Sequence, residues 1–323
     1  MSRCQAISTR NAVEVSNLTK QFADLVAVDH ISFQVRQGEL FGFLGPNAAG
    51  KTTTMRMLTG VIKPDEGAAA IFGYDIVKEG LRTKQLMGIV PEMANAYVDL
   101  SAWNNLMLIG ELYGVPKIQR QMRAERLLKQ LGLHERKDHI VKGFSRGMKQ
   151  KLLLCMALIN EPRILFLDEP TSGLDVESQR LIRDMIRELN EKGTTVFLTT
   201  HNMEEANQLC NKIAIINHGR ISTVDSPEKL RSRSSGLQSI EVSFSKAVNI
   251  NELTKIQGVN EAKKTGDKIR LYVDDPSVVI DKLVEFARSR KIKIISLSTL
   301  APTLEDVFLK FVREGKKGGF YGR

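Results

Sequence analysis

A glycine-rich segment at residues 45–52 constrains the fold of this chain more than any other feature. It reads Gly-Pro-Asn-Ala-Ala-Gly-Lys-Thr and fits the pattern G-x-x-x-x-G-K-[ST], a loop whose backbone N–H groups surround nucleotide phosphates. The apolar run 40–44 before it predicts a strand, and residues 52–58 after it predict a helix whose positive end points at the phosphates. Because an ordinary glycine-rich turn needs neither neighbour, we expect an α/β nucleotide-binding domain.

The side chains of this loop have distinct expected roles. Lys51 would reach the β- and γ-phosphates, and the Thr52 hydroxyl would be a ligand of Mg²⁺. The residues expected to bind the nucleotide are Gly45, Pro46, Asn47, Ala48, Ala49, Gly50, Lys51, Thr52 and Thr53.

Two adjacent acids stand at the end of a later apolar strand. Asp168 closes the run 164–168, where a carboxylate can hold Mg²⁺ through its water shell. Glu169 follows it, and an acid just beyond the metal ligand is placed to polarise the attacking water as a general base. The alternative for this pair is a helix cap or plain surface. Together with the loop, the pair predicts nucleotide hydrolysis.

Alternating strands and helices indicate the architecture of the first domain, which we assign to residues 12–230. Continuous apolar runs separated by helical segments predict a parallel sheet that is covered on both faces. The alternating run 28–35 instead predicts a half-buried antiparallel strand. Helical periodicity prevails between residues 103 and 133, so a helical subdomain is expected over about 92–150.

The composition changes after this domain. Residues 231–236 are small and polar and predict a linker. The segment 237–314 follows the order βαββαβ of a small ferredoxin-like α+β domain, with a last helix at about 303–313, and shows no catalytic constellation. Residues 315–323 form a basic tail, for which contact with anionic lipid or nucleic acid is the alternative to a solvated terminus.

Charge, hydropathy and cysteine content bear on the class of protein. The net charge is +10, from 47 basic and 37 acidic residues. No apolar run approaches the roughly 18 residues that span a bilayer, so a membrane span would have to come from another polypeptide. The three cysteines, Cys4, Cys155 and Cys210, are far apart, which suits a reducing cytosol and does not suggest a metal cluster.

Four further motifs follow the loop in an order that resembles the ABC-type ATPases. Residues 144–150 (Phe-Ser-Arg-Gly-Met-Lys-Gln) are similar to the ABC signature, and residues 164–169 are similar to the Walker B strand. Residues 172–175 (Ser-Gly-Leu-Asp) resemble the D-loop, and His201 resembles the H-loop histidine. The resemblance covers about residues 13–225. The chain most resembles the ATP-binding subunits of prokaryotic exporters of the ABC-2 or multidrug type, whose membrane domain is a separate polypeptide.

This resemblance implies a fold and a set of functional residues. The fold would be a P-loop NTPase cassette with a parallel sheet core, an antiparallel β subdomain and a helical subdomain. Two cassettes would form a homodimer that holds ATP and Mg²⁺ between the phosphate loop of one and the signature of the other. His201 would contact the γ-phosphate, Asp175 would bridge the subunits, and Phe22 would stack on adenine, with core packing as the alternative. The signature residues implied to face the partner's ATP are Ser145, Arg146, Gly147 and Met148.

Three positions depart from the family's pattern. Ala48 replaces a usual glycine, and its methyl group would cost about 1 kcal/mol if the backbone needs a positive φ there. Glu92 replaces the Q-loop glutamine but still offers an oxygen, so Thr52, Glu92 and Asp168 are the candidate metal ligands. Arg146 replaces a signature glycine and would add a charge near the partner's ATP. Since none of these changes removes an acid, the base or the lysine, we expect an active ATPase.

The expected function is that of an ATP-binding and hydrolysing subunit that powers export of a substrate through an integral membrane permease. It would be cytoplasmic, held by the permease on the cytoplasmic face of the cell membrane, with no specific nucleic acid partner. The alternative is a soluble ABC-type ATPase acting on nucleic acid or ribosomes, which the basic charge favours. Those relatives carry tandem cassettes or a long coiled-coil insertion, whereas the segment between Thr52 and Ser145 has room only for a helical subdomain. Intact Asp168, Glu169 and His201 disfavour a sensor that does not turn over.

Overall fold

The computed structural model describes residues 11–92, 96–232, 238–300 and 303–308. The chain divides into two units, Met1–Ser226 and Pro227–Arg323. The sequence places this boundary after residue 230, a few residues further on. The predicted linker 231–236 lies mostly outside the described residues, and the predicted basic tail 315–323 lies wholly outside them.

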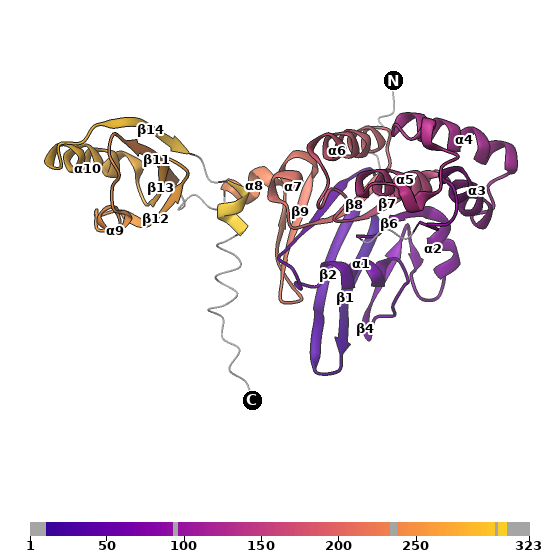
Figure 1. Ribbon diagram of the computed structural model, residues 1–323. Helices are drawn as coiled ribbons and strands as arrows, with labels where there is room; N and C mark the ends of the chain where they lie inside the picture. Colours follow the sequence, from indigo (N-terminus) through magenta and orange to yellow (C-terminus); the bar gives the residue numbers. More distant parts are fainter. Residues whose placement is uncertain (1–10, 93–95, 233–237, 301–302, 309–323) are drawn as a thin grey trace, which may run out of the picture. The chain divides into compact units, whose positions relative to one another are not determined.

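A six-stranded sheet forms the centre of the first unit (Figure 1). Its order is β10-β9-β3-β8-β7-β6, and all neighbours are parallel except the antiparallel edge pair β9 and β10. The strands are β3 (Leu40–Leu44), β6 (Met87–Val90), β7 (Ile164–Asp168), β8 (Thr195–Thr200), β9 (Lys212–Asn217) and β10 (Arg220–Asp225). Strands β3, β7 and β8 are buried along their whole length, which accounts for their continuous apolar sequences.

A second, antiparallel sheet has the order β2-β1-β4-β5. Its strands are β1 (Asn11–Phe22), β2 (Leu25–Arg36), β4 (Glu66–Ile71) and β5 (Tyr74–Asp75). The alternation seen in the sequence at 28–35 lies within β2, where Ile31, Phe33 and Val35 are buried between exposed neighbours. Strand β1 was not predicted, because its apolar residues do not keep a period of two through the register shifts that interrupt its pairing with β2.

The core of this unit lies between the two sheets. Phe33 of β2 stacks on Phe41 of β3 with ring centroids 5.5 Å apart, and Phe197 of β8 lies 5.8 Å from Phe41. Helix α1 (Lys51–Leu58) contacts strands of both sheets and buries Met57 and Leu58 in the same core. The helix that starts at the phosphate loop is therefore held rigidly by apolar packing on two sides.

Among the remaining helices of the first unit, α2 and α5 contact β6, and α3 and α4 lie together next to α5 (Figure 1). Helices α3, α4 and α5 contact one another, and α6 and α7 contact β8. The bounds are α2 (Gly80–Leu86), α3 (Ala102–Leu112), α4 (Lys117–Gln130), η1 (His134–Arg136), η2 (Val141–Gly143), α5 (Arg146–Leu158), α6 (Val176–Glu191) and α7 (Met203–Leu209). Pro116 is the N-cap of α4 and separates this helix from α3.

The second unit contains the expected βαββαβ order. Its sheet is antiparallel throughout, with the order β12-β13-β11-β14, and α10 contacts β11 and β14. The elements are α8 (Pro227–Ser232), β11 (Gln238–Phe244), α9 (Ile250–Leu253), β12 (Val259–Thr265), β13 (Lys268–Val273), α10 (Pro276–Ser289) and β14 (Ile294–Leu300). Residues 304–308 are helical, Thr303 before them is not, and residues 309–313 of the predicted last helix lie outside the described residues. The predicted fold class of both parts is confirmed.

None of the helices that the structure describes has both the length and the apolar character required to cross a bilayer.

Candidate active site

The predicted site residues come together because of the strand order. Strands β3, β8 and β7 are adjacent and parallel, so the segments that leave their carboxyl ends meet at one edge of the sheet. The phosphate loop follows β3, Asp168 closes β7, and His201 follows β8. Residues that are more than 100 positions apart in the sequence are thus brought into one site.

The backbone of the phosphate loop requires two unusual conformations. Gly50, at the start of α1, has a φ of +105°, and a Cβ there would lie 2.6 Å from the carbonyl oxygen of Ala27. Ala48 has a φ of +62°, so the condition for a methyl penalty at this position is met. The loop is also held from outside, since Gly219 N donates to Ala49 O at 3.0 Å and Gly45 N donates to Thr200 O at 3.4 Å.

The ammonium group of Lys51 lies inside this loop. Its Nζ donates to Gly45 O at 2.8 Å and to Pro46 O at 3.2 Å, and it lies 3.4 Å from Glu169 Oε1. Both Lys51 and Glu169 are buried. A buried cation that is paired with an acid at the end of β7 is suited to bind an anionic phosphate.

Two oxygen groups provide candidate ligands for a hard cation. The Thr52 hydroxyl lies 3.4 Å from Asp168 Oδ1, and the Thr199 hydroxyl donates to the same carboxylate oxygen. Hydroxyl and carboxylate oxygens are the donors that Mg²⁺ prefers, so these residues fit the ion. Glu92 follows β6 at the same sheet edge and is exposed, and residues 93–95 after it lie outside the described part.

Glu169 is in contact with the predicted H-loop histidine. Its Oε2 lies 2.8 Å from Nδ1 of His201, whose side chain is 53% exposed. Glu169 has a φ of +49°, a left-handed conformation that is uncommon outside glycine, and its N–H donates to Thr199 O at 3.0 Å. One carboxylate oxygen of the predicted base therefore faces Lys51 and the other faces His201.

The signature residues stand at the start of a helix. Ser145 is the N-cap of α5, and its hydroxyl oxygen accepts from Met148 N at 3.2 Å. The helix begins at Arg146. A Cβ on Gly147 would lie 2.8 Å from Ser178 Oγ, so the glycine allows α5 to approach α6 closely. The N–H groups of Arg146 and Gly147, which precede the capped Met148, are placed to act as anion donors.

Arg146 is found next to the D-loop of its own chain. A Cβ on Gly173 would lie between 2.4 and 2.9 Å from three atoms of the Arg146 guanidinium group, which therefore covers this residue. Asp175 is the N-cap of α6, and Ser178 N donates to its Oδ1 at 2.8 Å. This backbone hydrogen bond lowers the pKa of Asp175. Signature and D-loop are thus in direct contact within one chain.

Phe22 does not pack in the hydrophobic core, which was the alternative to stacking on adenine. It ends β1 and is 47% exposed, and Lys20 Nζ lies 5.4 Å from the centre of its ring. An exposed ring at this place is free to stack on a base.

Sequence reasoning missed three polar residues that support the site. Thr199 binds Asp168, as described above. The Thr171 hydroxyl donates to Glu205 Oε1 at 2.7 Å, and Glu205 is only 1% exposed. Burial raises the pKa of Glu205, while the Thr171 and Thr200 hydroxyls act in the opposite direction. The sequence offered only a weak signal for Glu205. It is a glutamate four residues after His201, in a segment whose pattern is otherwise that of an amphipathic helix.

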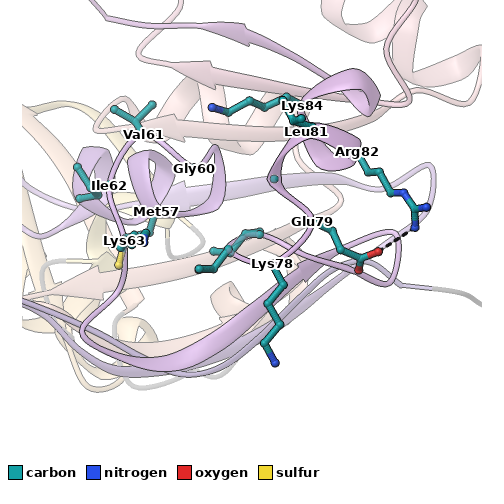
Figure 2. Close-up of a pocket in the computed structure, with 13 residues that line it drawn as sticks. Met57, Gly60, Val61, Ile62, Lys63, Lys78, Glu79, Leu81, Arg82 and Lys84 are labelled. Carbon is teal, nitrogen blue, oxygen red and sulfur yellow. Dashed lines mark hydrogen bonds and ion pairs between the residues drawn. The ribbon is translucent and has the colours of Figure 1, made fainter.

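A hollow of about 940 Å³ lies elsewhere in this unit, between the end of α1 and the segment leading into α2 (Figure 2). Val61 and Leu81 are exposed at it, and its one acid, Glu79, pairs with Arg82 at 3.0 Å. None of the predicted site residues lines it.

Comparisons with known protein families agree with this geometry. The family model described as ABC transporter matches residues 28–172. The model described as the C-terminal domain of DrrA1-3-like ATP-binding proteins matches residues 226–312.

Individual relatives match over almost the whole chain. The linearmycin resistance ATP-binding protein LnrL of Bacillus subtilis (strain 168) is 36% identical over 306 residues, which are 92% of this chain and 97% of the relative. The Nod factor export ATP-binding protein I of Ralstonia nicotianae is 33% identical over 304 residues, 94% of each chain. A solved dimeric bacterial ABC transporter cassette is 25% identical with a TM-score of 0.62, covering 66% of this chain and 98% of its own.

Proposed function

The chain belongs to the family of ABC transporter ATP-binding proteins, and we propose that it powers export of a substrate through a separate transmembrane partner. As a member of this family it binds ATP and is an ATPase. The observation that carries the proposal is the meeting of Lys51, Glu169 and His201 at one edge of the sheet.

ATP would be bound by the phosphate loop in the following way. The N–H groups at the start of α1 and the Lys51 ammonium would bind the β- and γ-phosphates. Thr52 and Asp168 would hold Mg²⁺, with Glu92 as a further candidate, and the ion would neutralise charge on the phosphate oxygens. Phe22 would stack on the adenine ring.

The contacts of Glu169 suggest how the base becomes active. Lys51 is attracted both by Glu169 and by the loop carbonyls, so phosphate binding would draw its Nζ away from the carboxylate. Glu169 Oε1 would then be free to accept a proton from the attacking water. His201 would keep the other oxygen in place through its Nδ1 and would contact the γ-phosphate with the opposite ring nitrogen.

We propose a homodimer as the active form. Ser145 and Arg146 are exposed at the start of α5, whereas Gly147 is buried. Ser145, Arg146, Gly147 and Met148 would close over the partner's γ-phosphate, while Asp175 would reach the facing subunit. The dimeric structure of a related cassette supports this arrangement. Closure on ATP and opening after hydrolysis would move the permease, which would hold the chain at the cytoplasmic face of the membrane. Two relatives named for drug resistance and Nod factor export support the export role.

The test compares three variants of the full chain. Glu169→Gln neutralises the base but keeps its size, so hydrolysis should fall at least ~100-fold while an ATP-dependent dimer accumulates. Lys51→Ala should lose ATP binding. Glu188→Gln alters a surface acid that pairs with Lys192 and should hydrolyse ATP at the parental rate. Hydrolysis is measured as phosphate release and dimerisation by light scattering after size exclusion.

Two outcomes would contradict the proposal. Hydrolysis by Glu169→Gln at the parental rate would exclude Glu169 as the base. Failure of that variant to dimerise with ATP, alone or together with its permease, would exclude the two-subunit site. Co-purification tests the partner: a membrane protein with several spans supports export, whereas ribosomal RNA or DNA would support the alternative.

A further inference from the structure

Glu205 is a buried acid to which the mechanism above assigns no role. It lies in the first turn of α7, four residues after His201, and is 1% exposed. Its carboxylate accepts from the Thr171 hydroxyl at 2.7 Å, and its N–H donates to Asn202 Oδ1 at 3.1 Å. Burying a carboxyl group this deeply costs free energy of folding unless hydrogen bonds compensate for the lost water. We therefore ask what the contacts of Glu205 do for the fold and for the site.

The contacts of Glu205 join the segments that carry the catalytic pair. Thr171 stands two residues after Glu169, in the turn that leads to the D-loop. Thr200 directly precedes His201, and its hydroxyl oxygen accepts from Asn202 N at 3.0 Å, while Asn202 Oδ1 accepts from Glu205 N. The carbonyl oxygen of Thr200 accepts from Gly45 N, the first residue of the phosphate loop. Glu205 therefore connects the exits of strands β7 and β8, through its carboxylate and its backbone N–H respectively, next to the exit of β3.

The backbone conformation of Glu169 depends on the contacts of the turn that follows it, which include the bond between Thr171 and Glu205. With a φ of +49° Glu169 is held in a region that residues with a side chain avoid. Its N–H donates to Thr199 O, its carbonyl oxygen accepts from Ser172 N at 3.1 Å, and Thr171 is tied to Glu205. Without the last contact the turn can relax toward negative φ, which would turn the Glu169 carboxylate away from His201.

We propose that Glu205 is a positioning residue for ATP hydrolysis. By holding Thr171 it keeps the turn of Glu169 in its left-handed conformation and sets the 2.8 Å contact between Glu169 and His201. This inference rests on the proposed function, because it presupposes that Glu169 is the base. Glu205 itself touches neither ATP nor water in this scheme.

Four single variants of the full chain test this role. Glu205→Met removes the hydrogen bonds but fills the space, and Thr171→Val removes the hydroxyl from the other side of the same bond. Glu205→Gln keeps an acceptor for Thr171 and is the conservative variant. Thr59→Val is the matched control, because the buried Thr59 hydroxyl donates to Met55 O at 2.9 Å away from the site.

The expected result is a selective loss of turnover. Glu205→Met and Thr171→Val should lower kcat at least ~10-fold, with KM and the Kd for a non-hydrolysable ATP analogue changed less than ~3-fold. The double variant should be no worse than the worse single one, because both remove one contact. Glu205→Gln should retain at least about half of the parental kcat, and Thr59→Val should keep kcat even where its Tm falls.

Three results would overturn the inference. The first is a folded Thr171→Val variant with the parental kcat. The second is a loss of ATP affinity in Glu205→Met or Thr171→Val that is as large as the loss of kcat. The third is a double variant in which the two losses of kcat add. If Glu205→Met does not fold, Thr171→Val and Glu205→Gln still decide the question. The proposed function is judged separately, by hydrolysis in the parental chain and its loss in Glu169→Gln. A parental chain that hydrolyses ATP while the Thr171 and Glu205 variants match it refutes only the positioning role.

Discussion

Replacement of Gly50 by alanine tests whether the conformation of the phosphate loop tolerates a side chain at this position. A Cβ on Gly50 would lie 2.6 Å from the backbone oxygen of Ala27, which cannot rotate away, and the residue has a φ of +105°. Gly38 provides the control, since it also has a positive φ, +73°, but a Cβ there would meet nothing within 4 Å. Both changes restrict the unfolded chain equally, so that contribution cancels when the two variants are compared.

The expected magnitudes follow from these two environments. Alanine in a left-handed conformation should cost Gly38→Ala about 1–2 kcal/mol of the free energy of unfolding. Gly50→Ala should lose about 1–3 kcal/mol more, because the contact with Ala27 forces the loop to shift. That shift also moves the N–H groups at the start of α1, so Gly50→Ala should lose ATP binding while Gly38→Ala keeps it.

The assay is urea unfolding followed by tryptophan fluorescence. The chain has a single tryptophan, Trp103 in α3, so the signal reports the first unit alone. ATP affinity is measured on the same preparations. Equal stability and equal ATP affinity of Gly50→Ala and Gly38→Ala would refute the steric argument.

Two further predictions concern the D-loop and the buried thiols. Gly173→Ala should weaken ATP-dependent dimerisation, because the new Cβ must displace the Arg146 guanidinium. Adding Arg146→Ala should recover part of the lost dimerisation. If it recovers none, the clash with the guanidinium is not the cause of the loss. Burial raises the pKa of Cys155 and of Cys210 far above the usual range, so in a Cys4→Ser chain a disulfide reagent at about pH 8 should label them only on unfolding. Rapid labelling of the native chain would contradict that burial.

The local chemistry of the site was predictable from short stretches of sequence. The loop 45–52 is recognisable because a strand, glycines, a lysine and a threonine occur in fixed succession, and all of these are local properties. The parallel strands were equally recognisable, since burial on both faces leaves continuous apolar runs. The role of Arg146 was not predictable, because the position of its side chain beside Gly173 depends on how α5 packs against the D-loop.

The sequence by itself determined which groups are present: a phosphate loop, two adjacent acids proposed as metal ligand and base, and a histidine. The tertiary structure alone decided which of them touch, because strand order is set by non-local pairing that no short segment encodes. That order brings Lys51 and His201 to opposite oxygens of Glu169. The tertiary structure also buries Glu205 against Thr171, two residues after Glu169, a contact that the sequence of α7 does not indicate.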